Sequence, residues 1–139
     1  MCKVLVIDDE GMIRNLVKQA LHMLDYAVET AQDGRVGIAK FDTGSYDLVI
    51  TDICMPEADG HQVVNHIRNS AHRWTPVIGM SGTPWHLNNH HFDEVLPKPF
   101  GIDKLMEAAR SLTAGRCQPN PPFTSVIPEG SVDPRYTAS

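Results

Sequence analysis

Residues 4–11 read VLVIDDEG, in which four apolar residues are followed at once by three carboxylates and a glycine. The apolar run is short and rich in β-branched residues, which is typical of a buried strand. Two carboxylates about 4 Å apart repel each other by roughly 1 kcal/mol in water and about 4 kcal/mol at an effective dielectric of 20. Such a pair is tolerable where it is fully solvated or where a cation lies between its members.

Composition sets the class of protein. The chain has 139 residues, which is enough for one domain with a core and a modest tail. Its net charge is −5, and the sequence contains no local cluster of Lys and Arg, so we expect no nucleic-acid partner. No apolar stretch approaches the length of a transmembrane helix, and MCKVLVIDD is not a signal peptide, so we expect no membrane association. The three cysteines, Cys2, Cys54 and Cys117, are far apart and lack metal-ligand spacing, which predicts reduced thiols and a cytoplasmic location.

Five short apolar runs alternate with helical patterns. We predict strands at residues 2–7, 26–31, 46–50, 76–80 and 94–96, and helices at 12–24, 33–42, 59–68 and 102–112, with Asp59 as an N-cap. This alternation indicates an open α/β domain with a parallel sheet and helices on both faces. We expect the domain to cover residues 1–113. Residues 114–139 are rich in proline and predict an extended or flexible tail, or alternatively one that docks through Phe123, Val126 and Ile127.

Polar residues follow four of the five predicted strands. Asp8 and Asp9 follow the first strand, Asp52 the third, Ser81 the fourth and Lys98 the fifth. Because parallel sheets bind ligands beyond the carboxyl ends of their strands, these groups are expected to converge. Carboxylate oxygens are the ligands that Mg²⁺ prefers, and a bound cation would relieve the repulsion between the aspartates. One aspartate could then attack phosphorus, with an ammonium and a hydroxyl as donors to the phosphoryl oxygens.

The motifs VIDDEG, TDICMPEADG, MSG and LPKPF, in that order, resemble the receiver domain of two-component response regulators, over about residues 2–112. The resemblance implies a flavodoxin-like five-stranded parallel sheet with strand order 2-1-3-4-5. It implies that Asp52 is the phosphoacceptor and that Mg²⁺ is held by Asp8, Asp9, Asp52 and the backbone carbonyl of Cys54. By the same resemblance Ser81 is the switch hydroxyl, Lys98 is the active-site lysine, and the Lys98–Pro99 bond is often cis. The implied partners are a sensor histidine kinase or phosphotransfer protein and an unknown downstream protein.

The sequence departs from the family pattern in two places. The family usually has Tyr or Phe three residues before the lysine, where this chain has Val95. The segment from Ser81 to Lys98 is also about five residues shorter than in the family, which is more than one helical turn. We therefore expect the fourth helix of the family fold to be short, irregular or missing.

Three functions fit these observations. The first is a phosphorylatable receiver, which catalyses its own phosphorylation and dephosphorylation without being a conventional enzyme. The second is a pseudo-receiver that acts as a constitutive interaction module. The third is a phosphatase similar to the haloacid dehalogenases, which carry a DxD motif where this chain has Asp8, Asp9 and Glu10. The complete set of acidic residues with Ser81 and Lys98 favours the first.

Overall fold

The computed structural model describes residues 2–55, 57–82 and 91–117. Its elements, in chain order, are β1 (Lys3–Ile7), α1 (Gly11–His22), β2 (Ala27–Ala31), α2 (Gly34–Thr43), β3 (Leu48–Asp52), α3 (Gly60–Arg68), β4 (Val77–Ser81), β5 (Glu94–Pro97) and α4 (Ile102–Thr113). The predicted alternation of strands and helices is confirmed. Within these described ranges, no helix has both the length and the apolar character needed to cross a membrane.

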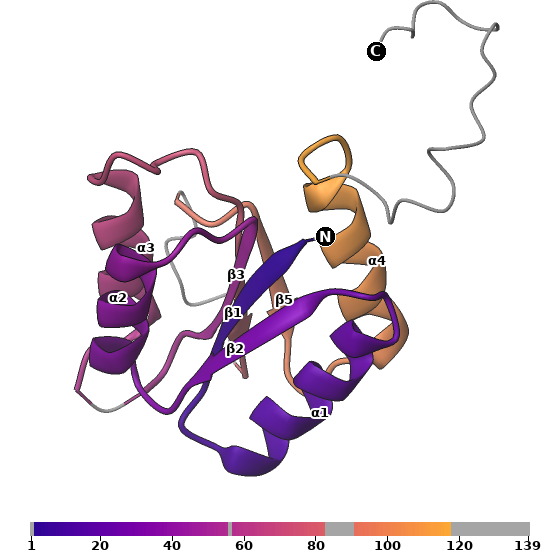
Figure 1. Cartoon of the computed structure of the whole chain (residues 1–139). Helices are drawn as coiled ribbons and strands as arrows, with labels where there is room; N and C mark the ends of the chain where they lie inside the picture. Colours follow the sequence, from indigo (N-terminus) through magenta and orange to yellow (C-terminus); the bar gives the residue numbers. More distant parts are fainter. Residues whose placement is uncertain (1, 56, 83–90, 118–139) are drawn as a thin grey trace, which may run out of the picture.

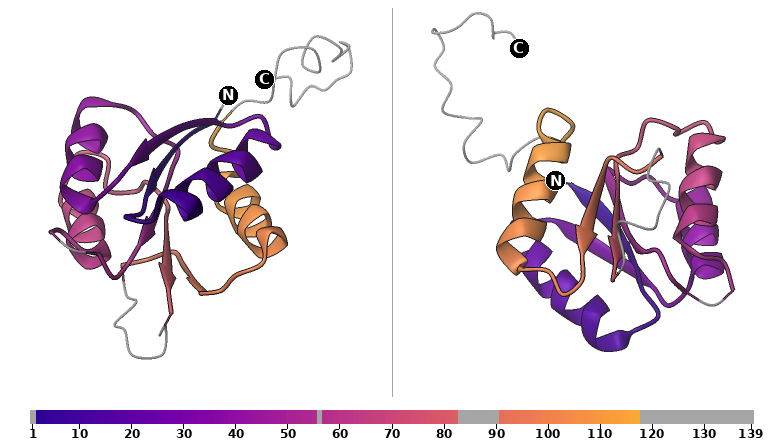
Figure 2. Two further views of the ribbon diagram at one scale, coloured as in Figure 1. Left: turned by 90° about the horizontal axis from the view of Figure 1, so that it is seen from below. Right: turned by 180° about the vertical axis from the view of Figure 1, so that it is seen from behind.

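The five strands form one parallel sheet in the order β2-β1-β3-β4-β5. The predicted flavodoxin-like fold is therefore confirmed. Helices α1 and α4 cover one face of the sheet, and α2 and α3 cover the other (Figures 1 and 2). Alternate residues of β1 point to opposite faces, so Val4 and Val6 belong to the core under α1 and α4, while Leu5 and Ile7 belong to the core under α2 and α3.

Local sequence explains where two of the helices begin. The side chain of Asp59 accepts a hydrogen bond from the backbone N–H of Gln62, and the Gln62 side chain accepts one from the backbone of Asp59. This reciprocal capping box satisfies two backbone donors at the start of α3 and confirms Asp59 as its N-cap. Asp33 caps α2 in a similar way, through the N–H of Val36.

Residues 83–90, between β4 and β5, lie outside the described part of the chain. The expectation that the family's fourth helix is short, irregular or missing here falls on these residues and stays a prediction. Beyond this gap, Phe92 is 8% exposed and packs in the core under α2 and α3, against the ring of His61. Arg68 at the end of α3 donates hydrogen bonds to the carbonyls of His91 and Thr75 and to the Asp93 carboxylate. Phe92 and Arg68 therefore hold the chain as it enters β5.

Two cysteines correct the sequence prediction. Cys2 and Cys117 form a disulfide, with Cα atoms 5.3 Å apart and a sequence separation of 115, so the expectation that all three thiols are reduced was wrong. The spacing of the residues gave no sign of it, because the fold brings the start of β1 beside the end of α4 (Figure 1). Cys54 is a free and exposed thiol. The predicted tail lies mostly outside the described residues, and its boundary at residue 113 stays a prediction, although α4 ends there.

Candidate functional site

Four strand ends meet at the carboxyl edge of the sheet. Asp8 follows β1, Asp52 ends β3, Ser81 ends β4, and Lys98 follows β5. One carboxylate oxygen from each of Asp8, Asp9 and Asp52 lies within 4.8 Å of the other two. The sheet thus brings together the acidic residues that the sequence singled out.

Lys98 is the cation among these carboxylates. Its Nζ lies 3.4 Å from Asp52 Oδ1, 3.6 Å from Asp8 Oδ2 and 3.7 Å from Glu10 Oε1. Its backbone N–H donates to the Ser81 carbonyl at 2.8 Å, which places the lysine beside the end of β4. The expected cis Lys98–Pro99 bond is present. Glu10 was not predicted as a site residue, although its position directly after Asp8 and Asp9 was the available signal.

Burial shifts the pKa values of Asp8 and Asp52. Asp8 is 0% exposed and Asp52 is 5% exposed. Burial, followed by repulsion from Asp8, raises the pKa of Asp52 to about 6, although Lys98 partly opposes this change. Burial also raises the pKa of Asp8. For Lys98, burial alone lowers the pKa, but the carboxylates of Asp8 and Asp52 raise it above its ordinary value. One lysine therefore does not fully compensate the negative charge of the cluster.

The acidic cluster fits a divalent cation with oxygen ligands. Asp8 Oδ1 accepts a hydrogen bond from the backbone N–H of Glu10, whereas Asp8 Oδ2 is buried and has no hydrogen-bond partner among the described residues. A buried carboxylate oxygen without a partner is unfavourable unless another positive group binds it. Asp9 is exposed at the mouth of the site. This donor set suits Mg²⁺, which combines a few carboxylate ligands with water.

A cavity of about 340 Å³ opens over the acidic cluster. It is lined by Asp9, Glu10, Asp52, Cys54, Gly82 and Lys98. A Cβ atom added at Gly82 would meet no atom within 4 Å, so a small donor could reach Asp52 from this side. Cys54 lies at this cavity, and its backbone carbonyl as a metal ligand stays a prediction.

Two neighbouring residues shape the loop and the strand around Asp52. A Cβ atom at Gly60 would lie 2.7 Å from Ile53 Cα and 2.8 Å from the Asp52 carbonyl oxygen. The first turn of α3 therefore packs directly on the backbone that follows Asp52, which only glycine allows. Ser81 is 1% exposed at the end of β4. Pro56, in the same loop, lies outside the described residues.

Val95 occupies the position where the family usually has an aromatic ring. It is half-buried, pairs with Gly79 of β4 and packs against the core under α2 and α3. Phe92 belongs to the same core cluster. An aromatic ring is thus present on this face, three residues earlier in the chain.

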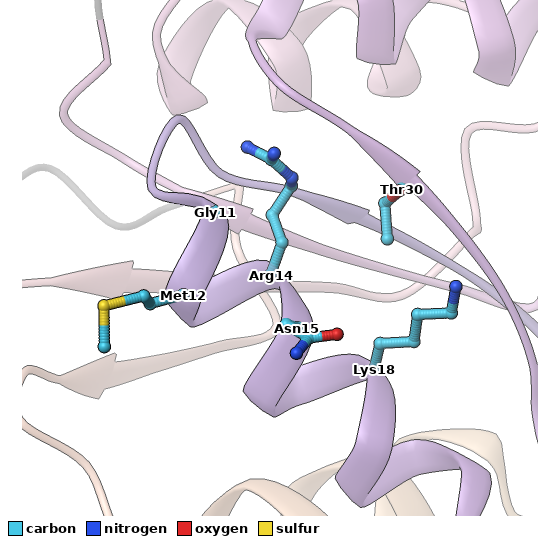
Figure 3. A pocket seen from close by; sticks show the side chains of 6 residues that line it. All are labelled: Gly11, Met12, Arg14, Asn15, Lys18 and Thr30. Carbon is cyan, nitrogen blue, oxygen red and sulfur yellow. The ribbon is translucent and has the colours of Figure 1, made fainter.

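A second cavity of about 370 Å³ lies along α1. Figure 3 shows its lining residues, which include Arg14 and Lys18 from α1 and Thr30 from β2. The guanidinium of Arg14 donates to the backbone carbonyl of Asp8 at 2.7 Å. None of its lining residues is acidic, so it is a basic surface next to the acidic site rather than part of the metal site.

Comparison with known proteins identifies this arrangement. Residues 4–110 match the family model of the response regulator receiver domain. The chain belongs to the response regulator receiver family. Receiver domains act in two-component signalling, where histidine kinases phosphorylate response regulators, and phosphorylation and Mg²⁺ binding are typical of them. The family match does not support the phosphatase interpretation, and nothing found favours the pseudo-receiver.

Relatives of this receiver are found among sequences and solved structures. Transcriptional regulatory protein TrcR of Mycobacterium tuberculosis is 34% identical over 115 residues, covering 79% of this chain and 44% of TrcR. The response regulator TrrA of Thermotoga maritima, in complex with Mg²⁺-BeF, is 36% identical with a TM-score of 0.74, covering 81% of this chain and 99% of that chain. CheY4 of Vibrio cholerae, a chemotaxis response regulator, is 30% identical with a TM-score of 0.74, covering 81% of this chain and 98% of that chain.

The chain spans less than half the length of TrcR. The expectation that no nucleic acid is a partner is not confirmed, because TrcR is a transcriptional regulatory protein and a DNA-binding partner is compatible with that relationship.

Proposed function

We propose that this receiver accepts a phosphoryl group on Asp52 from the phosphohistidine of a sensor kinase or phosphotransfer protein. The observation that carries the proposal is the position of Asp52, which is buried among two further carboxylates with Lys98 Nζ 3.4 Å away. A structural salt bridge needs one acid for one base. The additional carboxylates have a chemical use when a divalent cation and a phosphoryl group bind.

Asp8, Asp9, Asp52 and the backbone carbonyl of Cys54 are the proposed ligands of Mg²⁺. Asp8 Oδ2 supports this assignment, because it is buried without a hydrogen bond among the described residues and lies 3.6 Å from Lys98 Nζ. The Mg²⁺-BeF complex of the related TrrA also supports it. When bound, the cation would neutralise the carboxylates and the incoming phosphoryl oxygens, which lets an anionic nucleophile approach an anionic donor.

In the proposed transfer, a carboxylate oxygen of Asp52 attacks phosphorus and forms an acyl phosphate. The bond from phosphorus to the donor imidazole nitrogen breaks, and its electron pair stays on that nitrogen, which is protonated. Lys98 then stabilises the phosphoryl oxygens from the β5 side, and the Ser81 hydroxyl binds another of them from the β4 side. Hydrolysis at phosphorus would regenerate Asp52.

The donor protein has to approach the edge where α1 begins. Met12 is 87% exposed and Leu16 is 45% exposed on α1, close to the basic surface formed by Arg14 and Lys18. An exposed apolar group beside basic residues suits a protein partner rather than a small donor. We propose that the donor protein contacts this face of α1.

We also propose that the domain covers residues 1–113 and is located in the cytoplasm. A downstream protein would bind another part of its surface.

The test is intact-mass analysis after incubation with acetyl phosphate, with and without Mg²⁺. We expect one phosphoryl adduct on the wild type with Mg²⁺, and no adduct after removal of Mg²⁺ or in Asp52→Asn. Asp103→Asn, which changes an exposed carboxylate on α4, is the matched control and should be labelled like the wild type. An unlabelled wild type, with acetyl phosphate and also with a phosphorylated histidine kinase, would support the pseudo-receiver instead.

A further inference from the structure

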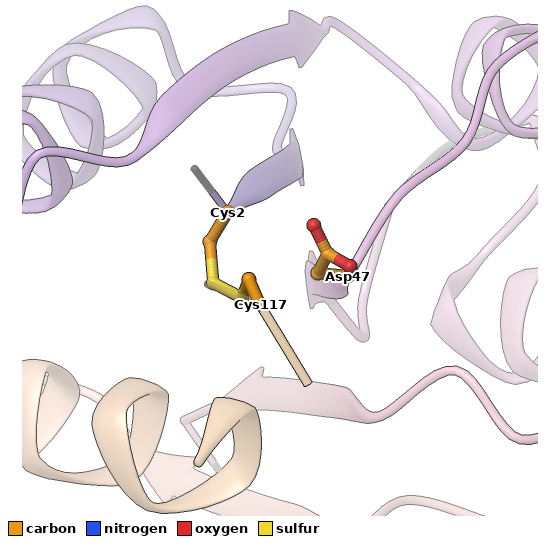
Figure 4. Close-up of side chains that lie close together, drawn as sticks. All are labelled: Cys2, Asp47 and Cys117. Atoms are coloured by element: carbon orange, nitrogen blue, oxygen red, sulfur yellow. A yellow bond between two sulfur atoms is a disulfide. The ribbon is translucent and has the colours of Figure 1, made fainter. Parts of the chain in front are cut away.

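The disulfide joins the two ends of the described chain at the edge of the sheet opposite the acidic site. Cys2 precedes β1, and Cys117 lies four residues beyond the end of α4 (Figure 4). Cys2 is 7% exposed, whereas Cys117 is half-buried. A thiol from solution can therefore reach the Cys117 sulfur more readily than the Cys2 sulfur, and accessibility is one determinant of exchange.

Asp47 provides a fixed negative charge beside the two sulfur atoms. Its carboxylate and both sulfurs lie within 4.8 Å of one another. Asp47 Oδ2 accepts a hydrogen bond from the backbone N–H of Lys3 at 2.9 Å, and the Asp47 N–H donates to the Lys3 carbonyl at 2.8 Å. These bonds hold the Asp47 carboxylate beside the sulfur atoms of Cys2 and Cys117. Its negative charge therefore disfavours a negatively charged thiolate on either sulfur.

Helix α4 has contacts with the rest of the domain that do not involve the disulfide. Leu105 and Ala109 are fully buried against the sheet, and the hydroxyls of Tyr26 and Thr113 are hydrogen-bonded at 2.8 Å. Beyond Thr113, the residues up to Arg116 are exposed. Opening the disulfide would therefore free residues 114–117 from Cys2 and leave α4 on the sheet, with the Arg116 N–H still able to donate to the Thr113 carbonyl.

We propose that Cys2 and Cys117 are a reversible thiol–disulfide exchange site for low-molecular-weight thiols and disulfides, which tethers or releases residues 114–117. Disulfides in cytoplasmic proteins are usually transient or redox-sensing rather than structural. This part of the inference rests on the proposed function, which places the protein in the cytoplasm.

The exchange has two balanced steps. A thiolate attacks Cys117 Sγ, the bond between the two protein sulfurs breaks, and its electron pair leaves on Cys2 Sγ, which takes a proton from solvent. A second thiolate attacks the external sulfur of the mixed disulfide and releases Cys117 as a thiol after protonation. In total, two small thiols are oxidised to their disulfide and the protein disulfide is reduced to two thiols. The reverse steps close the tether.

The first experiment equilibrates the full chain in mixtures of reduced and oxidised glutathione, blocks free thiols with N-ethylmaleimide, and measures the intact mass. We expect a change from three labels to one as the oxidised fraction rises, because Cys54 is labelled in both states. Cys2→Ser and Cys117→Ser, each lacking one partner, should show no such paired loss of labels. The oxidised form should melt about 10 °C above the reduced form, because the closed loop restricts the unfolded chain.

The second experiment tests the role of Asp47. Asp47→Asn keeps a side-chain oxygen that can accept the Lys3 hydrogen bond but removes the charge, so we expect reduction by glutathione to become at least about threefold faster. Hydrogen exchange should rise on reduction at residues 114–117 and remain slow at Leu105 and Ala109.

Three results would overturn the proposal. The first is three free thiols in excess oxidised glutathione. The second is a disulfide that opens only when the whole domain unfolds, which would make it a structural cross-link. The third is stoichiometric binding of Zn²⁺ by the reduced chain, weakened by Asp47→Asn, since Cys2, Cys117 and Asp47 would then be a metal site. None of these measurements involves Asp52. A result that overturns the thiol-exchange proposal would therefore leave the proposed phosphorylation of Asp52 untouched, and the reverse also holds.

Discussion

Replacing Asp52 by asparagine should stabilise the metal-free protein at neutral and alkaline pH. The buried Asp52 carboxyl has a pKa of about 6 in place of the ordinary 3.8, because burial and Asp8 disfavour its charged form more than Lys98 favours it. The folded state therefore holds its proton more tightly than the unfolded state does. Stability contributed by protonated Asp52 is lost as pH rises from about 4 through about 6. Above that range, the ionised carboxylate destabilises the fold by about 3 kcal/mol.

Urea denaturation in the presence of a chelator measures this effect. At pH 8, Asp52→Asn should be more stable than the wild type by up to about 3 kcal/mol, which moves the midpoint by roughly 1 M or more. At pH 4 the difference should nearly vanish, because wild-type Asp52 is then protonated. Glu107→Gln, which neutralises an exposed carboxylate on α4, should show no comparable dependence on pH. Excess Mg²⁺ should then stabilise the wild type more than the variant.

A less stable Asp52→Asn protein at pH 8 without Mg²⁺ would refute this reasoning. A gain of equal size at pH 4 and pH 8 would also refute it, because the benefit would then come from packing or hydrogen bonding and not from removal of a buried charge.

Three further predictions concern the site and its surroundings. The affinity for Mg²⁺, followed by calorimetry, should fall steeply below about pH 6, because protons compete for Asp52 and Asp8, whose pKa values are both raised. Gly60→Ala should destabilise the fold by about 1–3 kcal/mol in chemical denaturation and slow labelling by acetyl phosphate, because the new Cβ would press on the Asp52 carbonyl at 2.8 Å. Met12→Ser should slow phosphotransfer from a histidine kinase severalfold and leave labelling by acetyl phosphate unchanged; equal effects on both donors would argue against a protein contact at this exposed residue.

The sequence predicted the sheet and the acidic edge because both depend on local patterns. Apolar runs mark buried strands, and polar residues after them mark strand ends at one edge of a parallel sheet. The third strand shows the limit of this reasoning. It was predicted at residues 46–50 and lies at Leu48–Asp52, because the polar residues Thr51 and Asp52 are buried and continue the pairing with β4.

Local sequence patterns did not predict the contacts between segments that are distant in the chain. The Cys2–Cys117 disulfide depends on where α4 ends relative to β1, and the bonds of Arg68 to His91 and Asp93 depend on how the chain enters β5. Neither follows from the spacing of residues along the chain. Glu10 was predictable only in part. Its position beside Asp9 is visible in the sequence, but its contact with Lys98 depends on the fold.

Strand β1 carries a reactive group at each end. Cys2 precedes it and Asp8 follows it, and its pairing with β2 on one side and β3 on the other keeps it from moving independently. At about 3.3 Å per residue the two ends are roughly 20 Å apart, which is well beyond a Debye length of about 8 Å at physiological ionic strength. A charge added at the Asp52 site is therefore too remote to alter the sulfur chemistry directly. The proposed phosphorylation of Asp52 and the proposed thiol exchange would then vary independently, which would give one small domain four distinguishable chemical states.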